Sequence, residues 1–140
     1  MIALARPAAL AVVVLFAVGA AGCKSKNEGV IVGKWRVDGT EFGIAKLGVG
    51  TQASVVYEFT ADKRFEVVAT IRSGGVTETK TLTTGKYRLG EGYTVYLSDL
   101  TPPIDGKTSS TERIIITNNN TMSISADRPK PLLLFRVTEK

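Results

Sequence analysis

The amino-acid sequence predicts an all-β fold, a small antiparallel barrel of about eight strands, with a two-sheet sandwich as the alternative. From residue 30 onward, apolar residues alternate with polar ones, and turn residues interrupt the alternation every eight to twelve residues. Six threonines lie between Thr70 and Thr84, and β-branched residues suit a pleated surface. No stretch sustains the 3.6-residue spacing of an amphipathic helix.

The alternation predicts the strands in order. They are expected at residues 30–37, 54–60, 64–72, 75–83, 85–90, 92–98, 111–117, 121–126 and 131–138. Turn residues at 61–63, 90–92 and 118–120 separate neighbouring strands, as expected of short antiparallel hairpins. The best candidate for a helix is a single short turn at residues 42–47.

One predicted strand differs from the others because its faces are polar. Thr77, Thr79 and Thr81 lie on one face of residues 76–82, and Glu78 and Lys80 lie on the other. A strand buried in a barrel wall carries at least one apolar face. Residues 76–82 are therefore expected to form an exposed or edge strand.

The first 22 residues predict a cleaved secretory signal peptide. A short segment ending at Arg6 precedes an apolar run from Ala8 to Val18, and small residues follow as far as Gly22. A retained transmembrane helix would need about 20 apolar residues to cross the bilayer. The stretch from residue 8 to residue 22 is only 15 residues long and ends in glycines.

The residues Ala20-Ala21-Gly22-Cys23 resemble the lipobox of bacterial lipoproteins, although leucine is usual where Ala20 stands. The resemblance implies that Cys23 receives acyl chains such as palmitate and becomes the mature N-terminus; an ordinary signal-peptidase cut near Ala20 is the alternative. Lys24, in place of an aspartate, implies sorting to the outer membrane, where the protein faces the periplasm. Residues 24–29 contain no apolar side chain and are expected to be a short solvated tether.

The residues Gly33-Lys34-Trp35 resemble the Gly-x-Trp of lipocalin-like proteins, which opens their first strand. In that family a basic residue near the chain end packs across the tryptophan at the closed end of the barrel. Arg136 is the matching residue in this chain. The resemblance therefore implies a structural plug made of Gly33, Trp35 and Arg136, held in part by a cation-π contact.

The resemblance extends over most of residues 30–138. The segment Tyr57-Glu58-Phe59-Thr60-Ala61-Asp62, then Phe65, then Gly85-Lys86-Tyr87 is similar in order to small bacterial lipoproteins with a lipocalin-like domain. Two features depart from the pattern. Lys63-Arg64 stands where a glycine-containing turn is usual, and the chain lacks the C-terminal helix of true lipocalins.

Composition excludes several kinds of catalytic and metal site. The chain has no histidine and a single cysteine, Cys23, which excludes disulfides, Cys/His zinc clusters, Ser-His-Asp triads and Cys-His dyads. Asp99, Asp105 and Glu112 are neighbours in sequence, but no pattern sets any two of them across a cleft. The formal charge of +5 is dispersed, unlike that of a nucleic-acid-binding face. No catalytic residue, metal, cofactor or nucleic-acid partner is predicted.

The leading hypothesis is a non-enzymatic binding domain attached to the cell envelope by a lipid. Six inward positions would surround a small apolar ligand if the barrel holds a cavity, or pack together if it does not: Tyr57, Phe65, Val67, Tyr87, Val95 and Ile115. The second hypothesis is a structural or protein-interaction module of the envelope. It would use the strand at 76–82 or the loop at 99–110, which contains Pro102-Pro103, to contact an envelope protein.

Overall fold

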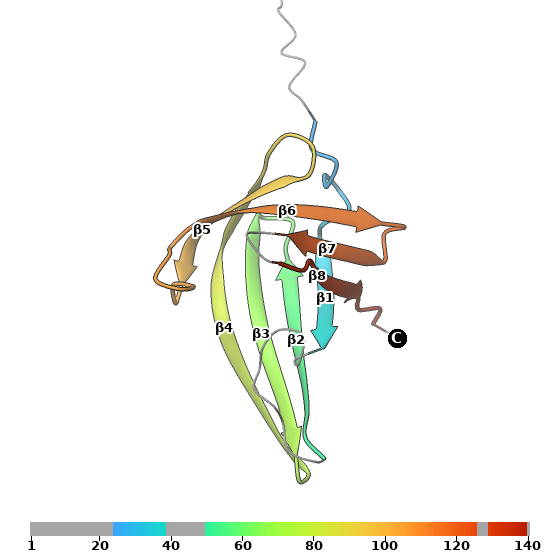
Figure 1. Cartoon of the computed structure of the whole chain (residues 1–140), viewed down its shortest axis with the longest axis vertical. Helices are drawn as coiled ribbons and strands as arrows, with labels where there is room; N and C mark the ends of the chain where they lie inside the picture. Colours follow the sequence, from blue (N-terminus) through green and yellow to red (C-terminus); the bar gives the residue numbers. More distant parts are fainter. Residues whose placement is uncertain (1–23, 39–49, 126–128, 140) are drawn as a thin grey trace, which may run out of the picture.

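The computed structural model describes residues 24–38, 50–125 and 129–139 of the 140-residue chain. Within these residues the protein is an all-β closed barrel of eight antiparallel strands, in which each strand pairs with the next and β8 pairs with β1 (Figure 1). The prediction of a barrel is confirmed, and the two-sheet alternative is not formed. The strands are β1 Gly33–Asp38, β2 Gln52–Phe59, β3 Arg64–Ser73, β4 Val76–Leu89, β5 Thr94–Thr101, β6 Ser110–Thr117, β7 Thr121–Ser125 and β8 Leu132–Arg136.

The strands predicted at 75–83 and 85–90 are one strand, β4, so the expected break between them is wrong. Gly85 lies within β4, and a Cβ atom there would sit 2.6 Å from the carbonyl oxygen of Ser98 and 2.7 Å from the ring of Phe65. Glycine is needed at this position because neighbouring atoms approach closely, not because the chain turns. The helical turn expected at 42–47 lies outside the described residues.

Two hairpins show how the sequence sets the strand connections. Gly74 and Gly75 form the two-residue turn between β3 and β4, with φ angles of 55° and 80°. Lys63 takes the corresponding left-handed conformation, with φ 66°, in the turn between β2 and β3. Lys63 therefore occupies the position where the family resemblance would place a glycine.

The core is the inner face of the barrel, and alternate residues of each strand point into it. Phe59, the last residue of β2, packs in this core with its ring centroid 6.0 Å from that of Phe65 and 5.3 Å from that of Tyr87. The other buried apolar residues are Ile31, Trp35, Val37, Val55, Val67, Ala69, Val95, Leu97, Leu100, Ile114, Met122, Ile124, Leu132 and Leu134. Burial of these side chains supplies the main favourable free energy of folding.

Strands β3 and β4, of 10 and 14 residues, are the longest of the described strands, so the β3–β4 hairpin extends beyond the rest of the barrel (Figure 1). β5 pairs with β4 only between Thr84 and Leu89. Among the described strands, none therefore pairs with the β5-facing side of residues 76–83. The expectation of an exposed edge strand at 76–82 agrees with this pairing.

The segment predicted as a loop at 99–110 is partly strand. Residues 99–101 complete β5, and Ser110 begins β6. The intervening residues form a small hairpin of their own, in which Ile104 pairs with Lys107. The Thr83 hydroxyl donates a hydrogen bond to the carbonyl of Pro102, 2.9 Å away, and this bond ties the segment to β4.

Candidate functional site

Most of the residues predicted to surround an interior ligand pack against one another. Phe65, Val67, Tyr87 and Val95 are buried in the core with at most 3% of their surface exposed. Tyr57 is half-buried and packs against the same core. Because these side chains fill the space between the strands, the described part of the interior is a packed core.

Ile115 does not belong to this set, so its predicted inward position is wrong. Ile114 is 1% exposed and pairs with Ile124, whereas Ile115 is half-buried and pairs with Ser123. Successive side chains of a strand point to opposite faces, so Ile114 faces inward and Ile115 faces outward. The three consecutive isoleucines of β6 do not indicate which of them face inward. The alternation of Met122 and Ile124 in the neighbouring strand β7 does, because these two residues pair with Ile116 and Ile114.

Trp35 and Arg136 meet at one end of the barrel, as the family resemblance implies. The guanidinium carbon of Arg136 lies 4.1 Å from the centroid of the Trp35 ring, and the two residues are register partners on β1 and β8. The indole N–H of Trp35 donates to the carbonyl of Ile31 at 2.9 Å. The fully buried Trp35 is thus covered by a cation on one side and held by a hydrogen bond.

Arg136 also connects three separate segments of the chain. Its guanidinium donates to the carbonyls of Val30 at 2.7 Å, Val32 at 3.0 Å and Asn119. Gly33 makes room for it, because a Cβ atom at Gly33 would lie 2.6 Å from Arg136 Nη1. Gly33 also has φ +135°, a conformation that side-chain-bearing residues rarely adopt.

Residues 24–29 differ from the solvated tether expected from their composition. The side chain of Asn27 is fully buried and donates to the carbonyl of Ile114 at 2.9 Å. The amide of Lys26 donates to the carbonyl of Gly92 at 2.7 Å. The segment is therefore part of the barrel and covers the end that contains Trp35. Cys23 lies directly before it, outside the described residues.

Tyr87 is the one interior residue with a perturbed ionisation among the described residues. Burial raises the pKa of its hydroxyl above the ordinary tyrosine value, and the charge of Asp62 acts in the same direction. The hydroxyl donates to the carbonyl of Thr60 at 2.7 Å. The hydroxyl therefore stays protonated at neutral pH and donates in this bond, which joins β4 to the turn after β2.

A groove of about 840 Å³ lies on the outside of the barrel. Arg36 of β1 lies between Phe135 of β8 and Val56 of β2 on this outer face, as their register shows. Phe135 is 55% exposed, an unusual degree for a phenylalanine. The other described lining residues are Val37, Thr51, Gln52, Ala53, Ser54, Thr70, Arg72 and Val137. The groove thus combines apolar surface with two guanidinium groups, from Arg36 and Arg72.

The sequence pattern around β8 is consistent with such an outer surface, although the groove was not predicted. Residues 132–135 are all apolar, Leu-Leu-Leu-Phe, so the strand presents apolar side chains on both faces. Leu132 and Leu134 are buried, whereas Leu133 and Phe135 are exposed. A strand that is apolar on both faces, in a chain whose other strands mostly alternate, is the sequence feature that could have predicted an apolar patch on the outer face.

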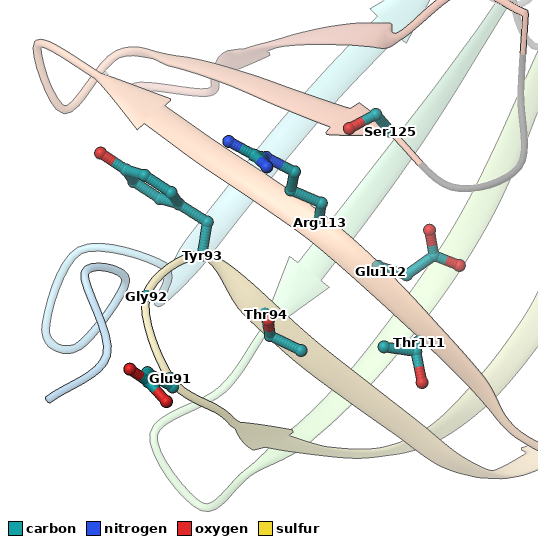
Figure 2. A pocket seen from close by; sticks show the side chains of 8 residues that line it. All are labelled: Glu91, Gly92, Tyr93, Thr94, Thr111, Glu112, Arg113 and Ser125. Carbon is teal, nitrogen blue, oxygen red and sulfur yellow. The ribbon is translucent and has the colours of Figure 1, made fainter. Parts of the chain in front are cut away.

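A second cleft, of about 620 Å³, lies beside the docked N-terminal segment (Figure 2). Tyr93 and Arg113 stand next to each other there, with the guanidinium carbon 5.8 Å from the ring centroid. Gly92, which accepts the hydrogen bond from Lys26, lines the same cleft. The cleft therefore lies at the end of the barrel that residues 24–29 cover.

Comparison with protein-family models, curated proteins and solved structures found no match for this chain. The described residues include no helix that is long and apolar enough to cross a membrane. No group of three or more histidine, cysteine, aspartate or glutamate side chains lies close enough to hold a metal ion in the described ranges.

Proposed function

We propose that the protein is a lipid-anchored, non-enzymatic binding domain of the bacterial cell envelope, and that it binds an apolar molecule with a negative charge in the outer groove. The observation that carries the proposal is exposed Phe135 in the same groove as Arg36 and Arg72. Burial of an apolar ligand body against Phe135 and Val56 is favourable. A carboxylate or sulfonate can accept charge-assisted hydrogen bonds from a guanidinium group.

The groove is preferred to the interior because of what a ligand would displace. Five of the six positions predicted to surround an interior ligand hold side chains that belong to or pack against the core; the sixth, Ile115, faces outward. An interior ligand would have to separate Phe59 from Phe65 or Tyr87, which are packed ring against ring. The groove lies on the outer face of the barrel, so a ligand there would not have to separate these packed rings.

The anchor is proposed at Cys23, where two or more acyl chains would hold the protein stably at a membrane. The docked segment supports a fixed orientation, because Ser25 already pairs with Gly92 two residues after the cysteine. Lys24 and Lys26 would then lie near anionic headgroups and add to the attraction. Growth with a labelled fatty acid should label the protein, and the label should disappear in Cys23→Ser; label that persists in this variant would refute the assignment.

Binding in the groove can be tested with 1-anilinonaphthalene-8-sulfonate, a fluorescent apolar anion. The full chain in detergent-free nanodiscs should bind the dye, and Phe135→Ser and Arg36→Gln should each weaken binding about fivefold or more. Leu133→Ser is the matched control, because Leu133 is exposed on the same face of β8 but does not line the groove. Equal loss of binding in Leu133→Ser would show that the dye binds exposed apolar surface in general, and it would contradict binding in the groove.

A second function, protein interaction in the envelope, is favoured by one specific observation. The β5-facing side of residues 76–83 in β4 has no strand partner among the described residues. Such an edge exposes backbone donors and acceptors that another strand can use.

A further inference from the structure

We infer that the free edge of β4 is a self-association site, at which the segment Val76–Leu82 pairs antiparallel with the same segment of a second copy. This inference goes beyond the proposed binding in the groove and does not depend on it. It rests on three observations: the exposure of the edge, the direction of its backbone groups, and the order of its side chains.

The edge is exposed as far as Thr81, and Leu82 at its far end is partly buried against the core. Residues 72–81 are all exposed, and Val76 retains 70% of its surface. The hairpin extends past β5 and β6, so the barrel wall does not cover it (Figure 1). Residues 76–82 also contain no proline, which would remove a backbone donor from the edge.

The backbone groups of alternate residues point toward this edge. Ser73 and Val76 flank the Gly74–Gly75 turn and are register partners. In a two-residue hairpin such flanking residues form a hydrogen-bonded pair, and the pairs then alternate along the ladder. Thr77, Thr79 and Thr81 therefore direct their backbone N–H and C=O groups away from β3, toward the free edge.

The side chains are complementary when two copies pair around Thr79. In that register Glu78 lies opposite Lys80 of the second copy, Thr77 lies opposite Thr81, and Val76 lies opposite Leu82. Opposite charges and matched threonines across antiparallel strands are favourable pairs. The threonines that expose their backbone groups also face each other, so hydrogen bonding and side-chain matching agree on one register.

Neighbouring registers lose this match. Centring the pair on Glu78 places two carboxylates opposite each other, and centring it on Lys80 does the same for two ammonium groups. If one strand instead slides by a single residue, Thr79 lies opposite Glu78 of the second copy. The backbone groups of Thr79 point to the free edge, whereas those of Glu78 point to β3, so the two residues cannot form hydrogen bonds with each other.

The assembly would end at two copies. Each β4 has one free edge, because its other edge is paired with β3 from Ser73 to Arg64. A twofold contact that uses this single edge closes on itself and leaves nothing for a third copy to join. The bulge between Val67 and Val68, opposite residues 81–83, also limits the length of regular edge available.

Cysteine cross-linking tests the register directly. The full chain carrying Thr79→Cys, extracted in detergent and mildly oxidised, should form a disulfide dimer, because paired residues of this kind have Cα atoms about 5.5 Å apart. Thr77→Cys is the matched control on the same face. Its two copies would lie about 13 Å apart along the strand, beyond the reach of a disulfide at about 7 Å. A mixture of Thr77→Cys and Thr81→Cys chains should cross-link.

Exchanging the charges of Glu78 and Lys80 tests the same register independently of the distance between the cysteines. Added to Thr79→Cys, Glu78→Lys should reduce the dimer about tenfold, and Lys80→Glu added to that variant should restore it. The unsubstituted chain measures any background from Cys23, and Phe135→Ser should leave the cross-link intact, which separates this result from the test of the groove. Equal cross-linking by Thr77→Cys and Thr79→Cys, or no effect of Glu78→Lys, would overturn the inference.

Discussion

The two ends of the barrel are built from the same antiparallel strands but are held in opposite ways. At the end that contains Trp35, the strands are closed by Arg136 and covered by residues 24–32, so aromatic and polar groups are buried together. At the end with the Gly74–Gly75 turn, the hairpin stands free, and residues 72–81 are exposed. The comparison indicates that the Trp35 end carries the stability of the domain, whereas the hairpin end is available for contacts with other molecules.

The largest expected effect at the Trp35 end is that of Trp35→Ala. Removing this fully buried side chain leaves a cavity and should lower the free energy of unfolding by about 3–5 kcal/mol. Thr79→Ala at the exposed end should change it by less than about 0.5 kcal/mol. Equilibrium unfolding in urea would measure both, and similar losses in the two variants would break the comparison.

The next effect compares two cation-π contacts. Arg136 over Trp35 also donates to the carbonyls of Val30 and Val32, so Arg136→Met should cost about 2–3 kcal/mol. Arg88 lies 4.2 Å from the centroid of the Tyr96 ring, but both residues are exposed. Arg88→Met should cost less than about 1 kcal/mol. Thermal unfolding of the two variants checks the difference, and an equal shift in Tm would show that burial adds nothing at the Trp35 end.

A smaller effect is expected from the docked N-terminal segment. Asn27→Ala removes the buried hydrogen bond to the Ile114 carbonyl and should cost about 1–2 kcal/mol. The amide of Lys26, bonded to Gly92, should at the same time exchange its hydrogen faster. Glu28→Ala is the control, because Glu28 is exposed on the same segment. Unchanged protection of Lys26 in the Asn27 variant would show that the segment is held by other contacts.

The smallest effect at neutral pH concerns Tyr87, and it grows at high pH. Tyr87→Phe loses the bond to the Thr60 carbonyl and should cost about 1 kcal/mol at pH 7. The raised pKa of Tyr87 means that the folded state keeps its proton after the unfolded state has begun to lose it, near pH 10. The contribution is therefore complete below about pH 10 and declines as the pH rises through the folded-state pKa. Urea unfolding between pH 8 and pH 11 should show a steeper decline in the parent chain than in Tyr87→Phe; identical slopes would contradict it.

Alternation in the sequence predicted the antiparallel strands and most of the inner face of the barrel, but it left a two-sheet sandwich open as an alternative. Val55, Phe59, Phe65 and Val67 point inward as their period of two indicates. The glycine-tryptophan motif and the distant Arg136 were likewise paired from sequence, because the resemblance supplied a partner that local patterns cannot.

The features that alternation could not predict depend on long-range contacts. Gly85 was interpreted as a break between strands. The reason for a glycine there is the ring of Phe65, which occupies the space where a Cβ atom would lie. Only the pairing of β3 with β4 brings that ring to Gly85, so the local sequence gives no sign of it. The burial of Asn27 depends on a carbonyl 87 positions further along the chain, and a polar segment carries no local sign of it. The outer groove likewise depends on Arg36 lying between Val56 and Phe135, which only the closure of the barrel brings about.

The direction of β4 sets the geometry of any pair of anchored molecules. β4 runs from the free hairpin toward the end that contacts Lys26, so an antiparallel pair places the two N-terminal ends at opposite extremes (Figure 1). Ten residues separate Thr79 from Leu89, which at about 3.3 Å per residue places these ends about 65 Å apart. If each copy of the proposed dimer carries the proposed lipid anchor at Cys23, two anchors at that separation would enter one bilayer only when the strands lie along its surface. In an upright orientation, the same pair would connect two facing membranes.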